Sequence, residues 1–112
     1  MGLEVNANKT NDVVIVKLLG NLDTNTAPDA EAEINKWLEE GAQKMIINLE
    51  QTNYVSSAGL RIFLATAKKI TASGGAVKLC AANEVVQEIL DISGFSSILD
   101  VKSSEEDALN DI

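Results

Sequence analysis

The sequence contains no histidine, and this absence removes many enzyme mechanisms at once. Histidine is the commonest general base and metal ligand, and every Ser–His or Cys–His nucleophilic pair depends on it. The chain also lacks a G-x-x-x-x-G-K-S/T phosphate loop and a G-x-G-x-x-G motif. The sequence therefore favours a binding protein over an enzyme, with no cofactor and no metal site.

Basic residues are scarce as well: nine Lys and Arg face seventeen Asp and Glu, which gives a net charge of −8. Because affinity for nucleic acids and anionic membranes depends on basic side chains, we expect neither as a direct partner. The only cysteine, Cys80, has no internal partner for a disulfide. No apolar run approaches the roughly 20 residues of a membrane span, and residues 1–4 do not start a signal peptide. These features predict a cytoplasmic protein.

Proline and aromatic residues are few, but hydrophobic residues make up 46% of the chain and charged residues 23%. This composition is typical of a packed globular protein and argues against disorder. The length of 112 residues suits one core. We therefore expect a single domain over residues 1–112.

The hydrophobic pattern begins with two strands and then alternates between helix and strand. Leu3–Ala7 alternates apolar and polar residues, whereas Val13–Leu19 is nearly all apolar, and the two are close enough to form an antiparallel hairpin. Helical and strand patterns then follow in turn to the end of the chain, with Thr26 as an expected helix cap and Val85 on an inward helix face. We predict an α/β fold with a mixed four- to five-stranded sheet and about four helices.

The stretch Tyr54–Leu60 lies where a strand pattern changes to a helical one, and Ser57 in it has three interpretations. As a helix N-cap it would stabilise the fold by about 1 kcal/mol. As a hydrolase nucleophile it would need a base, and a G-x-S-x-G elbow would need glycine in place of Val55, so this interpretation fails. As a phosphate acceptor it needs only exposure and a kinase, and a helix start tolerates the phosphate.

Several short motifs, in a consistent order, resemble the STAS-domain family of bacterial anti-sigma-factor antagonists over nearly the whole length. They are Gly20–Asp23 with Thr26-Ala27, Ile47–Leu49, Val55–Leu60, Gly74-Gly75 before a Val-Lys-Leu strand, and Ile92–Phe95. The resemblance implies a small STAS-like α/β domain that binds an anti-sigma factor with serine kinase activity. The unphosphorylated form would free a sigma factor, phosphorylation would reverse this, and a serine phosphatase would reset the switch.

The family pattern D-S-S/T-G-L places the phosphorylated serine directly after the aspartate. Alignment on Gly59 and Leu60 puts Ser57 at that position and Ser56 at the position of the aspartate. The resemblance therefore implies phosphorylation of Ser57, with Ser56 as the alternative acceptor.

Asp23 is either a turn residue that bonds nearby backbone N–H groups or part of a docking surface. Its loop follows a strand and precedes a helix, as the Ser57 loop does, so parallel neighbouring strands would bring both loops to one sheet edge. The resemblance supports the same placement. We expect a partner-binding surface composed of Asp23, Thr24, Asn25, Ser56, Ser57 and Arg61.

A second hypothesis keeps the domain but changes its role. A STAS module can be a scaffold in another bacterial signalling assembly, or a sensor of a small ligand or nucleotide. Co-purification of a kinase would favour the antagonist role, and a bound small molecule would favour the sensor role.

Overall fold

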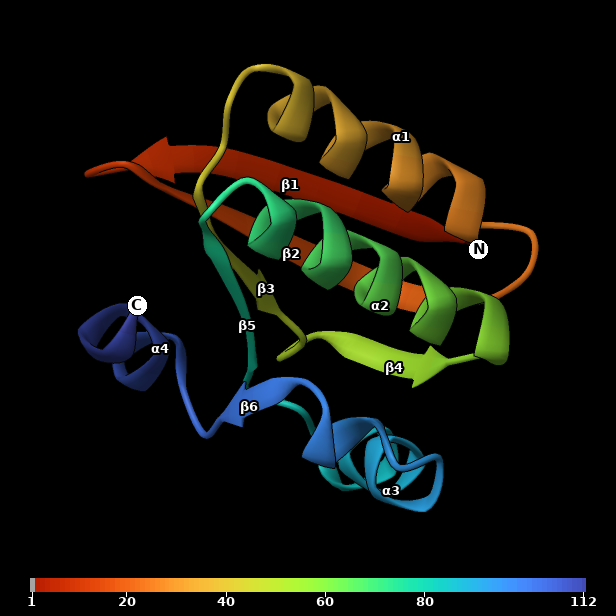
Figure 1. Cartoon of the computed structure of the whole chain (residues 1–112). Coiled ribbons are helices and arrows are strands. Elements are labelled where there is room, and N and C mark those ends of the chain that lie inside the picture. Colours follow the sequence, from red (N-terminus) through yellow and green to blue (C-terminus); the bar gives the residue numbers. More distant parts are fainter. Residues whose placement is uncertain (1) are drawn as a thin grey trace.

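The computed structural model describes residues 2–112, in which strands and helices alternate after an N-terminal hairpin (Figure 1). The elements are β1 (Leu3–Thr10), β2 (Val13–Leu22), α1 (Ala27–Glu39), β3 (Lys44–Asn48), β4 (Thr52–Val55), α2 (Ser57–Ala72), β5 (Ala76–Cys80), α3 (Glu84–Ile92), a 3-10 turn (Phe95–Ser97), β6 (Asp100–Lys102) and α4 (Glu105–Asp111). The α/β fold with four α-helices is confirmed.

The strands form one mixed sheet in the order β1-β2-β3-β5-β6. β1 and β2 are antiparallel, with Leu3 opposite Gly20 and Thr10 opposite Val13, so the expected hairpin is present. The other pairs, β2–β3, β3–β5 and β5–β6, are parallel, as right-handed helical crossovers require.

The sixth strand, β4, exceeds the expected number and pairs in parallel with the last residues of β2. β3 pairs with β2 only as far as Lys17, so the final stretch Gly20–Leu22 has a free edge that β4 occupies. The buried hydroxyl of Thr52 donates a 2.6 Å hydrogen bond to the Leu18 carbonyl and fixes the start of β4. This strand places the end of the Ser57 loop directly beside the end of β2.

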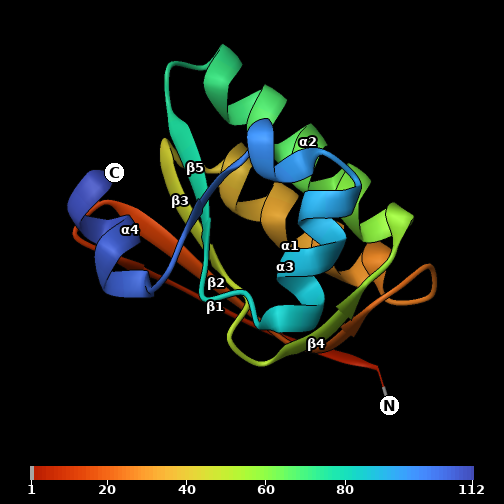
Figure 2. The same cartoon turned by 90° about the horizontal axis from the view of Figure 1, so that it is seen from below.

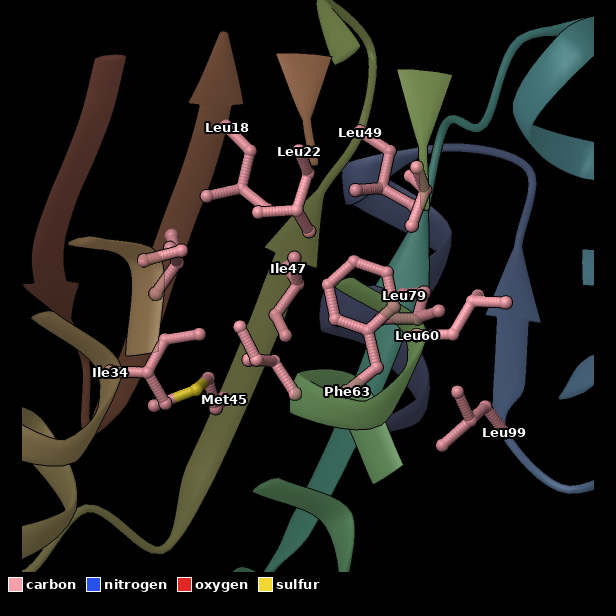
Figure 3. Close-up of a cluster of buried hydrophobic side chains, with 14 of the residues drawn as sticks. Leu18, Leu22, Ile34, Met45, Ile47, Leu49, Leu60, Phe63, Leu79 and Leu99 are labelled. Carbon is pink, nitrogen blue, oxygen red and sulfur yellow. The ribbon is translucent and has the colours of Figure 1, made fainter. Parts of the chain in front are cut away.

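Helices cover both faces of the sheet but unequally: α1, α2 and α3 lie on one face and α4 lies on the other (Figure 2). The main core fills the space under the first three helices (Figure 3). Alternate β2 residues serve the two faces, since Val14 and Val16 belong to this core and Val13 and Ile15 belong to a smaller cluster under α4. β2 is therefore buried on both faces, as its continuous apolar run predicts.

The C-terminal third departs from the expected pattern. Val85, expected to point inward, is 54% exposed, because the buried face of α3 is formed by Val86 and Leu90. The last strand, β6, has only three residues and begins at Asp100, after the 3-10 turn. Among the described residues, no helix combines the length and the apolar character that a membrane span requires.

Candidate functional site

Two loops meet at one edge of the sheet, at the carboxyl ends of the parallel strands β2 and β4. Leu22 pairs with Val55 in the last register position of the two strands. Just beyond it, the Ser56 N–H donates a 2.8 Å hydrogen bond to the Leu22 carbonyl. The expected convergence of the Asp23 and Ser57 loops is therefore correct, and β4 rather than β3 provides the neighbouring strand.

The loop between β2 and α1 is closed by hydrogen bonds among its own residues. The Asp23 carboxylate accepts from the backbone N–H groups of Asn25 (2.9 Å) and Thr26 (3.1 Å). The Thr26 hydroxyl donates to the Asn21 carbonyl (2.7 Å) and accepts from the Asp23 N–H (2.9 Å). The turn role of Asp23 is thus confirmed.

Thr26 stands at the N-cap position of α1, but its side chain makes no cap hydrogen bond to the helix. The expected cap is wrong because the preceding loop already uses the Thr26 hydroxyl as both donor and acceptor. Pro28 removes one of the free N–H groups of the first turn, and Asp29 supplies a favourable negative charge there.

The two serines at the start of α2 have different roles. Ser56 is the N-cap: its hydroxyl accepts from the Gly59 N–H at 3.4 Å, and its backbone is extended. Ser57 is the first helical residue, is exposed, and takes no part in the cap. The expectation that Ser57 itself caps the helix is therefore wrong by one residue, and the correction leaves the Ser57 hydroxyl accessible.

Gly59 explains how α2 begins so close to the two strands. A Cβ atom at this position would lie 2.8 Å from two atoms of the Leu22 side chain and 2.9 Å from Val55 Cγ1. Such distances are shorter than real Cβ contacts, so only glycine fits without a shift of the neighbouring residues. Gly59 therefore serves internal packing and joins the start of α2 to the ends of β2 and β4.

A groove of about 540 Å³ lies between the start of α1 and the first three turns of α2, and it begins at these loops. Its lining consists of Thr24, Ala27, Pro28 and Glu31 on one side and Ala58, Arg61, Ile62, Leu64, Ala65 and Lys68 on the other. Thr24 and Arg61, both expected in the docking surface, thus share one concave surface. Sequence reasoning missed Glu31 and Lys68, although Lys68 follows Arg61 by seven residues on the same helix face.

The remaining residues of the expected docking surface lie on the loops that border the groove. Asn25 is exposed in the closed loop, and Ser56 and Asp23 are half-buried by their own hydrogen bonds. Two of the six residues, Asp23 and Ser56, therefore shape the loops, and the other four present accessible side chains. No hydrogen bond joins the Asp23 and Ser57 side chains.

The main ionic cluster lies away from this edge, where Lys78 and Lys102 contact Asp100 and Asp111 at 2.6–3.5 Å. Within this cluster, the hydrogen bond that Lys78 donates to Asp100 holds the pKa of the Asp100 carboxyl below its usual range.

Cys80 is buried, and desolvation raises the pKa of its thiol to about 12, which suits the expected packing role. Residues 2–112 hold no group of three or more His, Cys, Asp or Glu side chains arranged for a metal ion.

These features define a small α/β binding domain whose accessible serine stands at a helix start, beside a second loop and a groove. The STAS domain family model matches residues 4–108, and the chain belongs to the STAS domain family.

Two relatives match nearly the full length. The Bordetella bronchiseptica protein BtrV, provisionally named an anti-sigma factor antagonist, is 33% identical over 106 residues, covering 95% of this chain and 91% of BtrV. The anti-sigma-B factor antagonist of Bacillus subtilis is 28% identical over 106 residues, covering 95% of this chain and 96% of that protein.

Solved structures show the same fold. An anti-sigma factor antagonist from Mycobacterium paratuberculosis has a TM-score of 0.91 at 22% identity, covering 98% of this chain and 93% of that one. The phosphorylated form of SpoIIAA, the Bacillus cell fate determinant, has a TM-score of 0.73 at 22% identity, with 96% of both chains covered.

Proposed function

We propose that this protein is an anti-sigma factor antagonist that is controlled by phosphorylation of Ser57. In its unphosphorylated form it binds an anti-sigma factor that is also a serine kinase, and a sigma factor is freed. Phosphorylation ends this binding, and a serine phosphatase restores it. Transcription regulators of this kind work in the bacterial cytoplasm, where we place the protein.

The names of the two relatives, matched over at least nine-tenths of each chain, support the antagonist role. The phosphorylated form of SpoIIAA is a precedent for a phosphate on this fold. The observation that carries the choice of Ser57 is the division of work at the start of α2: Ser56 is occupied as the cap, and Ser57 is exposed and uninvolved in it.

The start of α2 also tolerates a phosphate. The first N–H groups of a helix lack internal partners and favour negative charge, so the modification need not unfold the domain. The first turn of α2 contains no acidic residue that would oppose the added charge. A phosphate on Ser57 is therefore compatible with the fold.

Charge repulsion gives a sufficient reason for release. A phosphate adds about −1.5 to −2 charges. Two like charges at 4 Å repel by roughly 4 kcal/mol at an effective dielectric constant near 20. Since each 1.4 kcal/mol is about a tenfold change in affinity, one such contact with the nucleotide phosphates of a kinase would release the partner.

The test incubates the protein with a cognate anti-sigma factor kinase and ATP, and mass spectrometry then locates the phosphate. We expect one phosphate, on Ser57, and none on a Ser57→Ala variant. Phosphate that persists in Ser57→Ala and disappears in Ser56→Ala would move the site to Ser56. Absence of phosphate from both wild type and variants would contradict the switch.

Binding to the same kinase, measured by calorimetry, tests release. Ser57→Asp should weaken binding at least tenfold. Gln43→Glu is the matched control, because it adds one negative charge at an exposed position beside the start of β3, at the opposite end of the sheet (Figure 1). Equal affinity of Ser57→Asp and wild type would refute repulsion as the mechanism.

A further inference from the structure

The groove between α1 and α2 has the form of a site for another helix. Both helices begin at the same end of the sheet and run side by side (Figures 1 and 2). Small side chains line it on both sides, among them Ala27, Ala58 and Ala65. Small apolar residues allow a partner backbone to approach closely, and an amphipathic helix in an apolar groove is a common mode of recognition.

The charges along the groove are unusual for this chain. Arg61 and Lys68 lie on its α2 side, and α2 contains no acidic residue at all, although the whole chain carries −8. The ion pairs within residues 2–112 involve Lys78 and Lys102, so neither groove cation forms one, although Glu31 lines the α1 side of the same groove. Seven residues, or two helical turns, separate the two cations by about 10.5 Å along α2.

A hydrogen bond joins α1 and α2 next to the far end of the groove. Lys69 Nζ on α2 donates a 3.1 Å hydrogen bond to Asn35 Oδ1 on α1, just beyond Lys68. At its near end, Thr24 and Ala58 lie next to the loop that carries Ser57. The stretch from Ala58 to Lys68 is about 15 Å long, which corresponds to three turns of a helix.

We propose that this groove binds an acidic amphipathic helix of the anti-sigma factor, about three turns long. Its apolar face contacts the alanine-lined surface, and two of its acidic residues, seven positions apart, pair with Arg61 and Lys68. The proposal rests on the proposed function, because it takes the anti-sigma factor as the source of the helix.

This arrangement provides a second route from the phosphate to release. Ser57 and Arg61 are four residues apart on α2 and therefore lie on the same helix face. A phosphate on Ser57 attracts the Arg61 guanidinium, since Arg–phosphate pairs are strong and often bidentate. Phosphorylation thus competes with the acidic helix for one of the two groove cations.

The test uses the full chain and a designed probe. The probe is a 14-residue helical peptide with leucines on one face and glutamates seven positions apart; a second peptide has lysines in place of these glutamates. When the acidic peptide is added to the 15N-labelled protein, the amide NMR signals of Ala58, Ala65 and Glu31 should shift. The basic peptide should bind at least tenfold more weakly.

Charge reversal in the protein provides the matched experiment. Arg61→Glu and Lys68→Glu should each weaken binding of the acidic peptide about fivefold or more, and the double variant should prefer the basic peptide. Lys44→Glu, at an exposed position at the start of β3, is the control and should leave the affinity within twofold. Both groove cations are exposed, so the amide spectra should show intact folds.

Ser57→Asp should weaken binding of the acidic peptide when Arg61 is present. The same substitution should have a smaller effect on binding in a protein that also carries Arg61→Gln. Equal effects in the two backgrounds would overturn the competition. Equal binding of the acidic and basic peptides, or amide shifts confined to other surfaces, would overturn the groove. These outcomes are separate from the proposed function, because kinase binding and phosphorylation of Ser57 can persist when the peptide fails to bind.

Discussion

The two helices that face each other at the site begin in different ways. At α1, the hydroxyl of Thr26 is buried and forms short hydrogen bonds with the preceding loop. At α2, the cap bond of Ser56 is long, at 3.4 Å, and the next hydroxyl, Ser57, is exposed. Both loops follow parallel strands at the same sheet edge. The loop before α1 therefore uses its hydroxyl for internal hydrogen bonds, whereas the start of α2 leaves the Ser57 hydroxyl accessible for modification.

The comparison depends most on the tight packing of Gly59 against Leu22 and Val55. Replacement of this glycine should therefore have the largest effect on stability. Gly59→Ala places a methyl group 2.8–2.9 Å from these side chains. We expect a loss of about 2 kcal/mol in the free energy of unfolding, measured in urea, because overpacking of cores commonly costs 1–3 kcal/mol. At an exposed helix position alanine would instead stabilise by about 1 kcal/mol. A stabilised variant would show that the contact is not tight.

The second-largest loss of stability is expected in the closed loop before α1. Thr26→Val keeps the shape of the side chain and removes the hydroxyl that bonds to Asn21 and Asp23. We expect a loss of about 1–2 kcal/mol in the free energy of unfolding, since a buried donor and acceptor lose their partner. Thr24→Val, at an exposed position in the same loop, is the control and should change stability by less than about 0.5 kcal/mol. Equal costs would show that the loop does not need the Thr26 hydrogen bonds.

The two serines of α2 give a smaller and more discriminating effect. Ser56→Ala should cost about 1 kcal/mol, a usual value for a lost N-cap, whereas Ser57→Ala should stay within about 0.5 kcal/mol. Ser104→Ala removes the cap of α4, which accepts from Asp107 N–H at 3.1 Å, and is a reference for a cap. If Ser57→Ala lost more stability than Ser56→Ala, Ser57 would be the cap and Ser56 would carry the free hydroxyl.

The sequence predicted the fold because its strongest patterns belong to the core. The continuous apolar run of β2 reflects burial on both faces of the sheet. β4 escaped notice because it has only four residues and two of them, Asn53 and Tyr54, are exposed. Its pairing depends on the edge that β2 leaves open beyond β3, which is a tertiary property.

The site was predictable in position and less so in detail. The parallel loops could be inferred from chain order, but a one-residue choice between Ser56 and Ser57 as cap depends on where the helix dihedrals begin. Val85 was placed inward because it belongs to the apolar face of α3. Only one side of that face, with Val86 and Leu90, is buried, and periodicity alone does not show which side. The groove is formed by two separate helices, and only the structure shows that Glu31 and Arg61 line it together.

The face of α4 offers the smallest test of the comparison, because ion pairs add to the small apolar cluster that packs beneath this helix. Lys78 contacts both Asp100 and Asp111, and these interactions raise the pKa of Lys78 and lower the pKa of both aspartates. A lowered carboxyl pKa contributes stability that is present above the unfolded value near 3.9 and lost as pH falls through the folded value. The raised Lys78 pKa contributes stability below about pH 10 that is lost at higher pH.

We therefore expect the amide signals of α4, such as that of Ala108, to shift and broaden as pH falls below about 4, before those of α2 change. α2 has no acidic residue and its start is held by Gly59 packing, so no carboxylate in that helix titrates. Asp111→Asn should weaken the α4 response, and added salt should weaken the attachment of α4 near neutral pH because the Asp111 side chain is half exposed. Simultaneous loss of the α4 and α2 signals would mean that the ionic cluster is no separate attachment and that both faces depend on one cooperative core.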